Sequence, residues 1–202
     1  MKPILFNTDM VKAILDGQKT ETRRVVREPY RIDDEKLSRV SGLALHAGTD
    51  ATDRMPYPDS LYSVNDLLYV RETWSQTENG QDYLYRADAV GNAVKDRSGR
   101  WHVPKWRPSL HMPKEAARIF LRVTDVRVEM LQEITEVGAR NEGAEMIQNA
   151  RGLWSYRKGF ETIWNSTLKH MDHVRYGWTA NPWVWVISFE RYEMPAGWPD
   201  IE

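Results

Sequence analysis

The sequence predicts an α+β fold, a small mixed β-barrel with flanking helices. Several short runs rich in β-branched and aromatic residues alternate irregularly with three or four short amphipathic segments. Strands are expected at both ends of the core, and no regular strand–helix–strand repeat appears, which disfavours a doubly wound parallel sheet. A length of 202 residues fits one domain that carries insertions.

The first expected elements are a short helix and a strand. Asn7 or Thr8 can cap a helix, and Gly17 stands where a left-handed C-terminal cap belongs. Residues 18–26 then form an extended run with β-branched positions. The apolar side of the helix consists of Met10, Val11, Ile14 and Leu15.

The middle of the chain combines a long loop with several strands. Residues 29–60 are rich in Pro, Gly, Asp and Ser and read as an inserted loop. Strands are expected at residues 67–71 and 83–86, with a polar hairpin or loop up to residue 100. After a stretch kept irregular by prolines, a long strand should cover residues 117–130.

The last third is predicted to be mainly helical before a final strand. Thr135 should cap a helix that runs to Glu142, and a second helical piece is expected at residues 144–150. The helix with the most regular apolar stripe covers residues 155–169. Residues 183–189 are apolar on both faces and predict a buried strand.

Composition excludes several kinds of site. The absence of cysteine removes disulfides, thiolate zinc sites and cysteine nucleophiles, and is typical of a cytoplasmic protein. The five His are scattered, so we expect neither a metal site nor a cofactor. The N-terminal apolar run is too short for a signal peptide, and the longest apolar stretch, at residues 183–189, is too short to cross a membrane.

Positive charge is concentrated between residues 97 and 127. Eight Lys or Arg stand there against Glu115 and Asp125, a net charge of +6, with Trp101 and Trp106 among them. Cations for phosphates and flat rings for bases are typical of a single-stranded nucleic-acid surface. A solvated strand face followed by a polar loop explains the same pattern equally well.

The segment from Gly17 to Arg24 resembles the G-x-K-T-x-T-x-R signature of ASCH domains, relatives of the PUA RNA-binding fold. Residues 65–70, 134–142 and 183–189 resemble weaker family motifs in the same order, although Asn65 replaces the usual Gly. The longer pattern is similar to an enlarged version found in phage and prophage genomes. The resemblance implies one domain over residues 1–202, interrupted by insertions at 29–60 and 76–105.

The ASCH resemblance also implies a barrel of five or six strands with a cleft lined by the N-terminal motif. Some small members are amidohydrolases that remove the acetyl group from N4-acetylcytidine, and another is described as a ribonuclease. The Lys, Thr and helix Glu proposed to act together in the amidohydrolases match Lys19, Thr22 and Glu142.

These three residue types can perform acyl transfer. The Thr22 hydroxyl needs a base to take its proton, and Lys19 can be that base if burial or nearby charge lowers its pKa. Arg23 and Arg24 supply such charge, and Glu142 can pass a proton to the leaving amine. Alternatively, Lys19 and Thr22 form a solvated strand edge, with Arg23 and Arg24 paired to Glu21 and Glu28.

Arg23 and Arg24 are also candidates for ligand binding, and so are three further residues. Arg71 belongs either to a buried ion pair with Glu72 or to a pocket rim, and Trp106 and His111 can stack on or hydrogen-bond a base. Trp106 is also suited to anchoring a loop. The expected partner is RNA or a modified nucleoside, and four functions remain open: amidohydrolase, ribonuclease, non-catalytic RNA-binding module, or phage-encoded interaction protein.

Overall fold

The described chain is divided between two compact units, each assembled from segments distant in the sequence. The computed structural model describes residues 1–26 and 61–194. Each unit contains both helices and strands, so the predicted α+β class is confirmed. Within the described residues the first unit contains 1–18, 66–122 and 190–194, and the second contains 19–26, 61–65 and 123–189.

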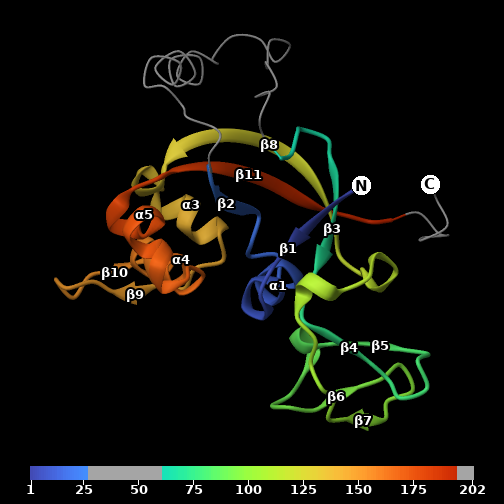
Figure 1. The fold of residues 1–202 in the computed structure, drawn as a ribbon. Helices are drawn as coiled ribbons and strands as arrows, with labels where there is room; N and C mark the ends of the chain where they lie inside the picture. Colours follow the sequence, from blue (N-terminus) through green and yellow to red (C-terminus); the bar gives the residue numbers. More distant parts are fainter. Residues whose placement is uncertain (27–60, 195–202) are drawn as a thin grey trace. The chain divides into compact units, whose positions relative to one another are not determined.

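The first unit is organised by strands β1 (Lys2–Leu5) and β3 (Leu67–Arg71), which pair in parallel (Figure 1). β3 also pairs antiparallel with the beginning of β8 (Phe120–Met130). Helix α1 (Thr8–Leu15) follows β1, and the Asn7 side chain caps it by accepting from the Met10 N–H at 2.9 Å. Gly17 has a φ of 71°, as the predicted C-terminal cap requires.

Two small hairpins complete the first unit. Trp74 packs in an apolar cluster with Met112 and Phe120, which ties one hairpin to the beginning of β8. The strands are β4 (Trp74–Gln76), β5 (Tyr83–Tyr85), β6 (Val94–Lys95) and β7 (Trp101–His102). Short 3₁₀ turns cover Arg86–Asp88, Ser109–His111 and Lys114–Ala116.

The second unit contains the remainder of β8, most of β11 (Trp183–Tyr192), and β2 (Glu21–Val25), which pairs antiparallel with β11. Figure 1 shows β8 and β11 as long curved strands running side by side. In hydrogen-bonding order the five strands are β1-β3-β8-β11-β2. Because this order has two ends among the described residues, closure into a barrel stays a prediction.

Two helices lie side by side in the second unit, α3 (Glu136–Asn141) and α4 (Tyr156–Ser166). Thr135 caps α3 as predicted, and Ser155 caps α4; the side chain of each accepts a backbone N–H group of the first turn. The core beneath them includes Leu131, Ile134, Ala139, Phe160, Trp164, Val184 and Val186. The remaining short elements are α5 (His173–Tyr176) and the 3₁₀ turns Leu131–Glu133, His170–Asp172 and Trp178–Ala180.

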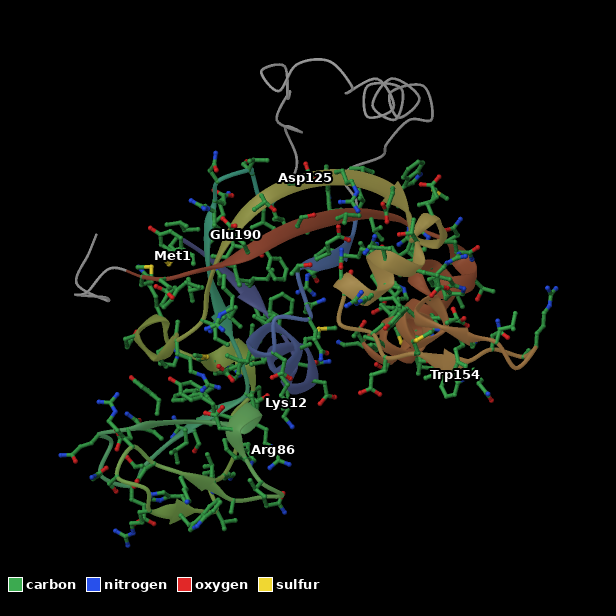
Figure 2. The ribbon with its side chains drawn as sticks, turned by 180° about the vertical axis from the view of Figure 1, so that it is seen from behind. Met1, Lys12, Arg86, Asp125, Trp154 and Glu190 are labelled. Carbon is green, nitrogen blue, oxygen red and sulfur yellow. The ribbon has the colours of Figure 1, made fainter. Side chains whose placement is uncertain are left out.

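The prediction of a helix at residues 144–150 is wrong. This segment begins a hairpin in which β9 (Ile147–Gln148) pairs with β10 (Trp154–Ser155). The Asn149 side chain accepts from two backbone N–H groups of the turn, which competes with helix formation. Figure 2 labels Trp154 on this hairpin, where 62% of its surface is exposed.

Other boundaries differ from prediction by a few residues. The long strand expected from residue 117 begins at Phe120, because the 3₁₀ turn at Lys114–Ala116 precedes it. The insertion expected at residues 29–60 lies outside the described residues, and the one at 76–105 contains the second small hairpin. No helix in the described part of the chain is long and apolar enough to cross a bilayer.

We predict that Gly159→Ala destabilises the protein by about 1–3 kcal/mol, the usual cost of overpacking. A Cβ at residue 159 would lie 2.0 Å from the Glu145 carbonyl oxygen, so α4 would have to move away from that backbone. Urea unfolding measures the loss. Thr162→Ala, on the exposed side of α4, is the control, and equal stability of the two variants would contradict the prediction.

Candidate functional site

A buried cluster of charged side chains in the second unit contains two of the predicted catalytic residues. The Thr20 N–H donates to the Asn141 carbonyl at 2.8 Å, which joins the segment before β2 to the end of α3. This backbone contact brings Lys19 and Glu142 together although 123 positions separate them. Glu142 is the C-cap residue of α3, so its carboxylate projects from the helix end.

The Lys19 amine is surrounded by acceptors. Its Nζ donates to the Glu21 carbonyl at 2.8 Å, the Glu142 carbonyl at 2.9 Å and the Glu142 Oε2 at 2.5 Å. The side chains of Lys19 and Glu142 are only 0% and 3% exposed. An ammonium has three protons to donate and these three oxygens accept, so this arrangement suits the charged form of Lys19.

Burial nevertheless lowers the pKa of Lys19 below its ordinary value, because a desolvated ammonium is disfavoured. Contact with Glu142 opposes this effect, while the neighbouring charges of Arg24 and Arg23 lower the pKa further. The environment therefore has the features that a lysine base requires, although the amine must first lose one of its protons to an acceptor.

Arg23 is the second cation on the Glu142 carboxylate. Its Nη1 lies 3.3 Å from Glu142 Oε1, while its Nε and Nη2 lie 2.8 and 2.7 Å from Glu129 Oε1 on β8. The predicted pairing with Glu21 exists only as a longer contact of 3.5 Å. Arg23 is thus shared by two carboxylates, and its own side chain is 1% exposed.

Thr22 and Arg24 alternate with Glu21 and Arg23 along β2, so their side chains point to the opposite face of the strand. Thr22 is buried at 2% exposure, and within the described residues no hydrogen bond joins its hydroxyl to Lys19 or Glu142. Burial lowers the pKa of Arg24, an effect opposed by Tyr62 and Glu142. Glu28, which was predicted with Glu21 to pair with Arg23 and Arg24, lies outside the described residues.

The remaining ligand-binding candidates belong to the first unit. Arg71 Nη2 donates to the Leu110 carbonyl, and Trp106 is half-buried with the Arg86 guanidinium 5.5 Å from its ring centre. His111 is exposed at the end of a 3₁₀ turn.

Of the two alternatives left open for Arg71, the ion pair with Glu72 is absent among the described residues. Glu72 is buried and accepts from Arg118 at 2.9 and 3.1 Å, and Arg118 also donates to Asp88 at 2.6 and 3.0 Å. Neighbouring residues of an extended chain point in opposite directions, which separates Arg71 from Glu72. Burial raises the pKa of Glu72, and its bonds to Arg118 oppose the rise.

The basic stretch at residues 97–127 is partly neutralised by carboxylates. Arg118 pairs with Glu72 and Asp88, Arg122 pairs with Glu190, and Arg127 pairs with several acids. The acids around Arg127 are Glu21, Glu129 and Asp125, the last of which Figure 2 labels on β8. These pairs reduce the charge available to phosphates below the value that the sequence indicates.

A polar hollow of about 380 Å³ lies in the first unit and contains none of the predicted site residues. Trp101 and the pair formed by Asp96 and His102, with Nε2 and Oδ2 2.7 Å apart, line it. In the part of the chain that the structure describes, no group of three His, Asp or Glu side chains could hold a metal ion.

Sequence reasoning missed Glu129 as a member of the buried cluster. It lies on β8, 106 positions from Arg23, and no local motif marks it. The alternation of residues 127–129 along the strand gives a weak signal, since it places Arg127 and Glu129 on one face.

Comparisons with known proteins leave the family open. No family model and no curated protein matches the chain. The solved structure of protein EF3133 from Enterococcus faecalis V583, of family DUF984, is similar over 90% of this chain and 65% of that chain, with 10% identity and a TM-score of 0.39. The chain thus spans slightly less than two thirds of that protein's length, and a likeness this low decides neither the fold family nor the function.

We predict that Lys19→Met lowers the free energy of unfolding by roughly 3–5 kcal/mol, because it removes one partner of a buried ion pair. The double variant Lys19→Met/Glu142→Leu should recover part of the loss, since it leaves no unpaired carboxylate there. Denaturant unfolding measures both. Lys12→Met, at an exposed position of α1, is the matched control, and an equally small effect at both lysines would contradict the prediction.

A second prediction concerns the pH dependence of stability. The folded-state pKa of Glu72 lies above its ordinary value of 4.5, so the folded protein binds more protons than the unfolded chain just above pH 4.5. The unfolding free energy of the wild type, minus that of Glu72→Gln, should therefore fall as the pH rises from 4.5. A rising difference for Glu72→Gln would refute the assignment.

Proposed function

We propose that the second unit carries an ASCH-like amidohydrolase site that acts on N4-acetylcytidine or a similarly acylated nucleoside. The observation that supports this proposal is the buried contact between Lys19 Nζ and Glu142 Oε2 at 2.5 Å. Lys19 stands shortly before β2, the strand that contains Thr22. These are the three positions at which the resemblance places catalytic groups. Burying a charged pair is costly, and perturbed groups of this kind cluster at functional sites.

The proposed reaction begins with a proton transfer inside the pair. The Lys19 ammonium gives a proton to Glu142, and the neutral amine can then take the proton of the Thr22 hydroxyl. The Thr22 oxygen attacks the acetyl carbonyl carbon, and protonated Glu142 gives its proton to the cytidine nitrogen as the carbon–nitrogen bond breaks. Water then hydrolyses the acetyl ester of Thr22 and releases acetate.

Substrate access is a further requirement of the proposal. The side chains of Lys19 and Glu142 are 0% and 3% exposed, so the groups that cover them must move before an acetyl group can reach Thr22. The Thr22 hydroxyl must also turn toward the amine or approach it during that movement, because β2 directs it to the other face from Arg23.

The fold that we propose is the PUA-like barrel of ASCH domains, formed by the strand order β1-β3-β8-β11-β2 with closure between its ends. A ribonuclease or an RNA-binding module would use the same fold. Both need cationic surface for phosphates, and the ion pairs of Arg118, Arg122 and Arg127 reduce that surface. A small uncharged nucleoside therefore suits the described residues better than RNA.

The test is release of cytidine and acetate from N4-acetylcytidine by the purified protein. We expect hydrolysis by the wild type and a loss of at least about 100-fold in kcat for Thr22→Val and Glu142→Gln, the range expected for groups that act in proton transfer. The control variants Thr20→Val and Glu145→Gln change exposed residues near the same segments and should keep full activity.

Labelled single-stranded RNA in the same assay separates the alternatives. Cleavage of RNA without release of cytidine would replace the amidohydrolase proposal by a ribonuclease. Binding of RNA that weakens steeply with salt, without any product, would favour a non-catalytic module. Full activity of Thr22→Val on N4-acetylcytidine would remove Thr22 as the nucleophile.

A further inference from the structure

We infer that Arg23, held by Glu129, is a positioning residue that fixes the Glu142 carboxylate against Lys19. This inference rests on the proposed function for its catalytic meaning, but the geometry that it describes can be tested without any substrate. The motif resemblance assigns roles to Lys19, Thr22 and Glu142, whereas the contact of Glu129 with Arg23 comes only from the tertiary structure.

The two oxygens of Glu142 have different partners. Oε2 accepts from Lys19 at 2.5 Å, and Oε1 faces Arg23 Nη1 at 3.3 Å. A carboxylate with one partner can rotate about its terminal bond, whereas one with partners on both oxygens has a preferred plane. Arg23 therefore restricts the plane of the group that exchanges a proton with Lys19.

Arg23 is itself fixed from the other side. Glu129 accepts from Nε and forms an ion pair with Nη2, and the guanidinium lies 5.8 Å from the centre of the Phe160 ring. A Cβ at Gly138 would lie 3.2 Å from Arg23 Nη2, so α3 also packs closely against the guanidinium. The β2 backbone, helix α3 and the ion pair with Glu129 thus fix the position of the Arg23 guanidinium.

A lysine at position 23 could not replace the arginine. The planar guanidinium presents donors in a rigid fork, which lets Nε and Nη2 contact Glu129 while Nη1 faces Glu142. A single ammonium would keep the charge but not both contacts in this geometry. Charge and geometry can therefore be separated by comparing Arg23→Lys with Arg23→Met.

A further arginine provides a matched control. Arg127 lies 3.4 Å from Glu21 and 3.5 Å from Glu129, so it belongs to the same charged cluster. Its ion pairs are with Glu21, Asp125 and Glu129, and its side chain is 34% exposed. Loss of Arg127 changes the charge of the cluster by the same amount as loss of Arg23 without removing a contact to Glu142.

The first measurement is kinetic, on N4-acetylcytidine. We expect Arg23→Met to lower kcat by roughly 10- to 100-fold with little change in KM, since a displaced catalytic group costs this much. Arg23→Lys should recover only part of the loss, and Arg127→Met should stay within about twofold of the wild type.

The second measurement needs no substrate. A buried ammonium with three acceptors exchanges its protons slowly with water, so the Lys19 Nζ protons should be visible by ¹⁵N NMR in the wild type. We expect faster exchange of these protons in Arg23→Met and in Glu129→Gln, and an unchanged rate in Arg127→Met. Glu129→Gln keeps the Arg23 charge, so it tests the anchor alone if Arg23→Met fails to fold.

The outcomes separate the two proposals. Hydrolysis by the wild type with unchanged kcat and unchanged Lys19 exchange in Arg23→Met would overturn the positioning role and leave the proposed function standing. Absence of hydrolysis by the wild type, together with faster Lys19 exchange in Arg23→Met and Glu129→Gln, would support the positioning role and overturn the proposed function. Unchanged exchange in both variants would overturn the positioning role whatever the activity.

Discussion

The second unit depends on the placement of one ion pair in a space closed to solvent. An ammonium and a carboxylate lose much hydration on burial, and this cost is offset only if each finds partners in good geometry. Lys19 therefore needs the Glu21 and Glu142 carbonyl oxygens besides the carboxylate, and Glu142 needs Arg23 besides the amine. The backbone bond from Thr20 to Asn141 holds the two segments at the distance that these contacts demand.

Outward from this pair, cationic and anionic side chains alternate, because each buried charge needs a partner of opposite sign. Arg23, once buried beside Glu142, requires Glu129, and Glu129 lies in turn against Arg127, which is partly exposed to solvent. The first unit also contains a buried carboxylate with a cationic partner, since Glu72 is buried against Arg118. In both units the long side chain of an arginine connects a buried carboxylate to a second, more exposed carboxylate, where solvent can screen the charge.

The proposed function rests on the site rather than on the fold class, because a small α+β framework is compatible with many activities. The charged cluster favours proton transfer, since it holds a lysine and a carboxylate in direct contact away from water. The same cluster contains Glu21, Glu129 and Asp125 near its surface, which makes that surface unsuited to a phosphate chain. These two features are the reason why we propose proton chemistry on an uncharged ligand.

By itself the sequence determined the local structure: the caps at Asn7 and Thr135, the left-handed Gly17, and the strands at 67–71 and 183–189. These features depend on neighbours within a few positions, so side-chain caps and apolar periodicity reveal them. Only the tertiary structure decided that Glu129 binds Arg23, that Glu72 binds Arg118, and that residues 147–155 form a hairpin. Charge partners far apart in sequence are selected by burial and distance, and a short apolar run becomes helix or strand according to what it packs against.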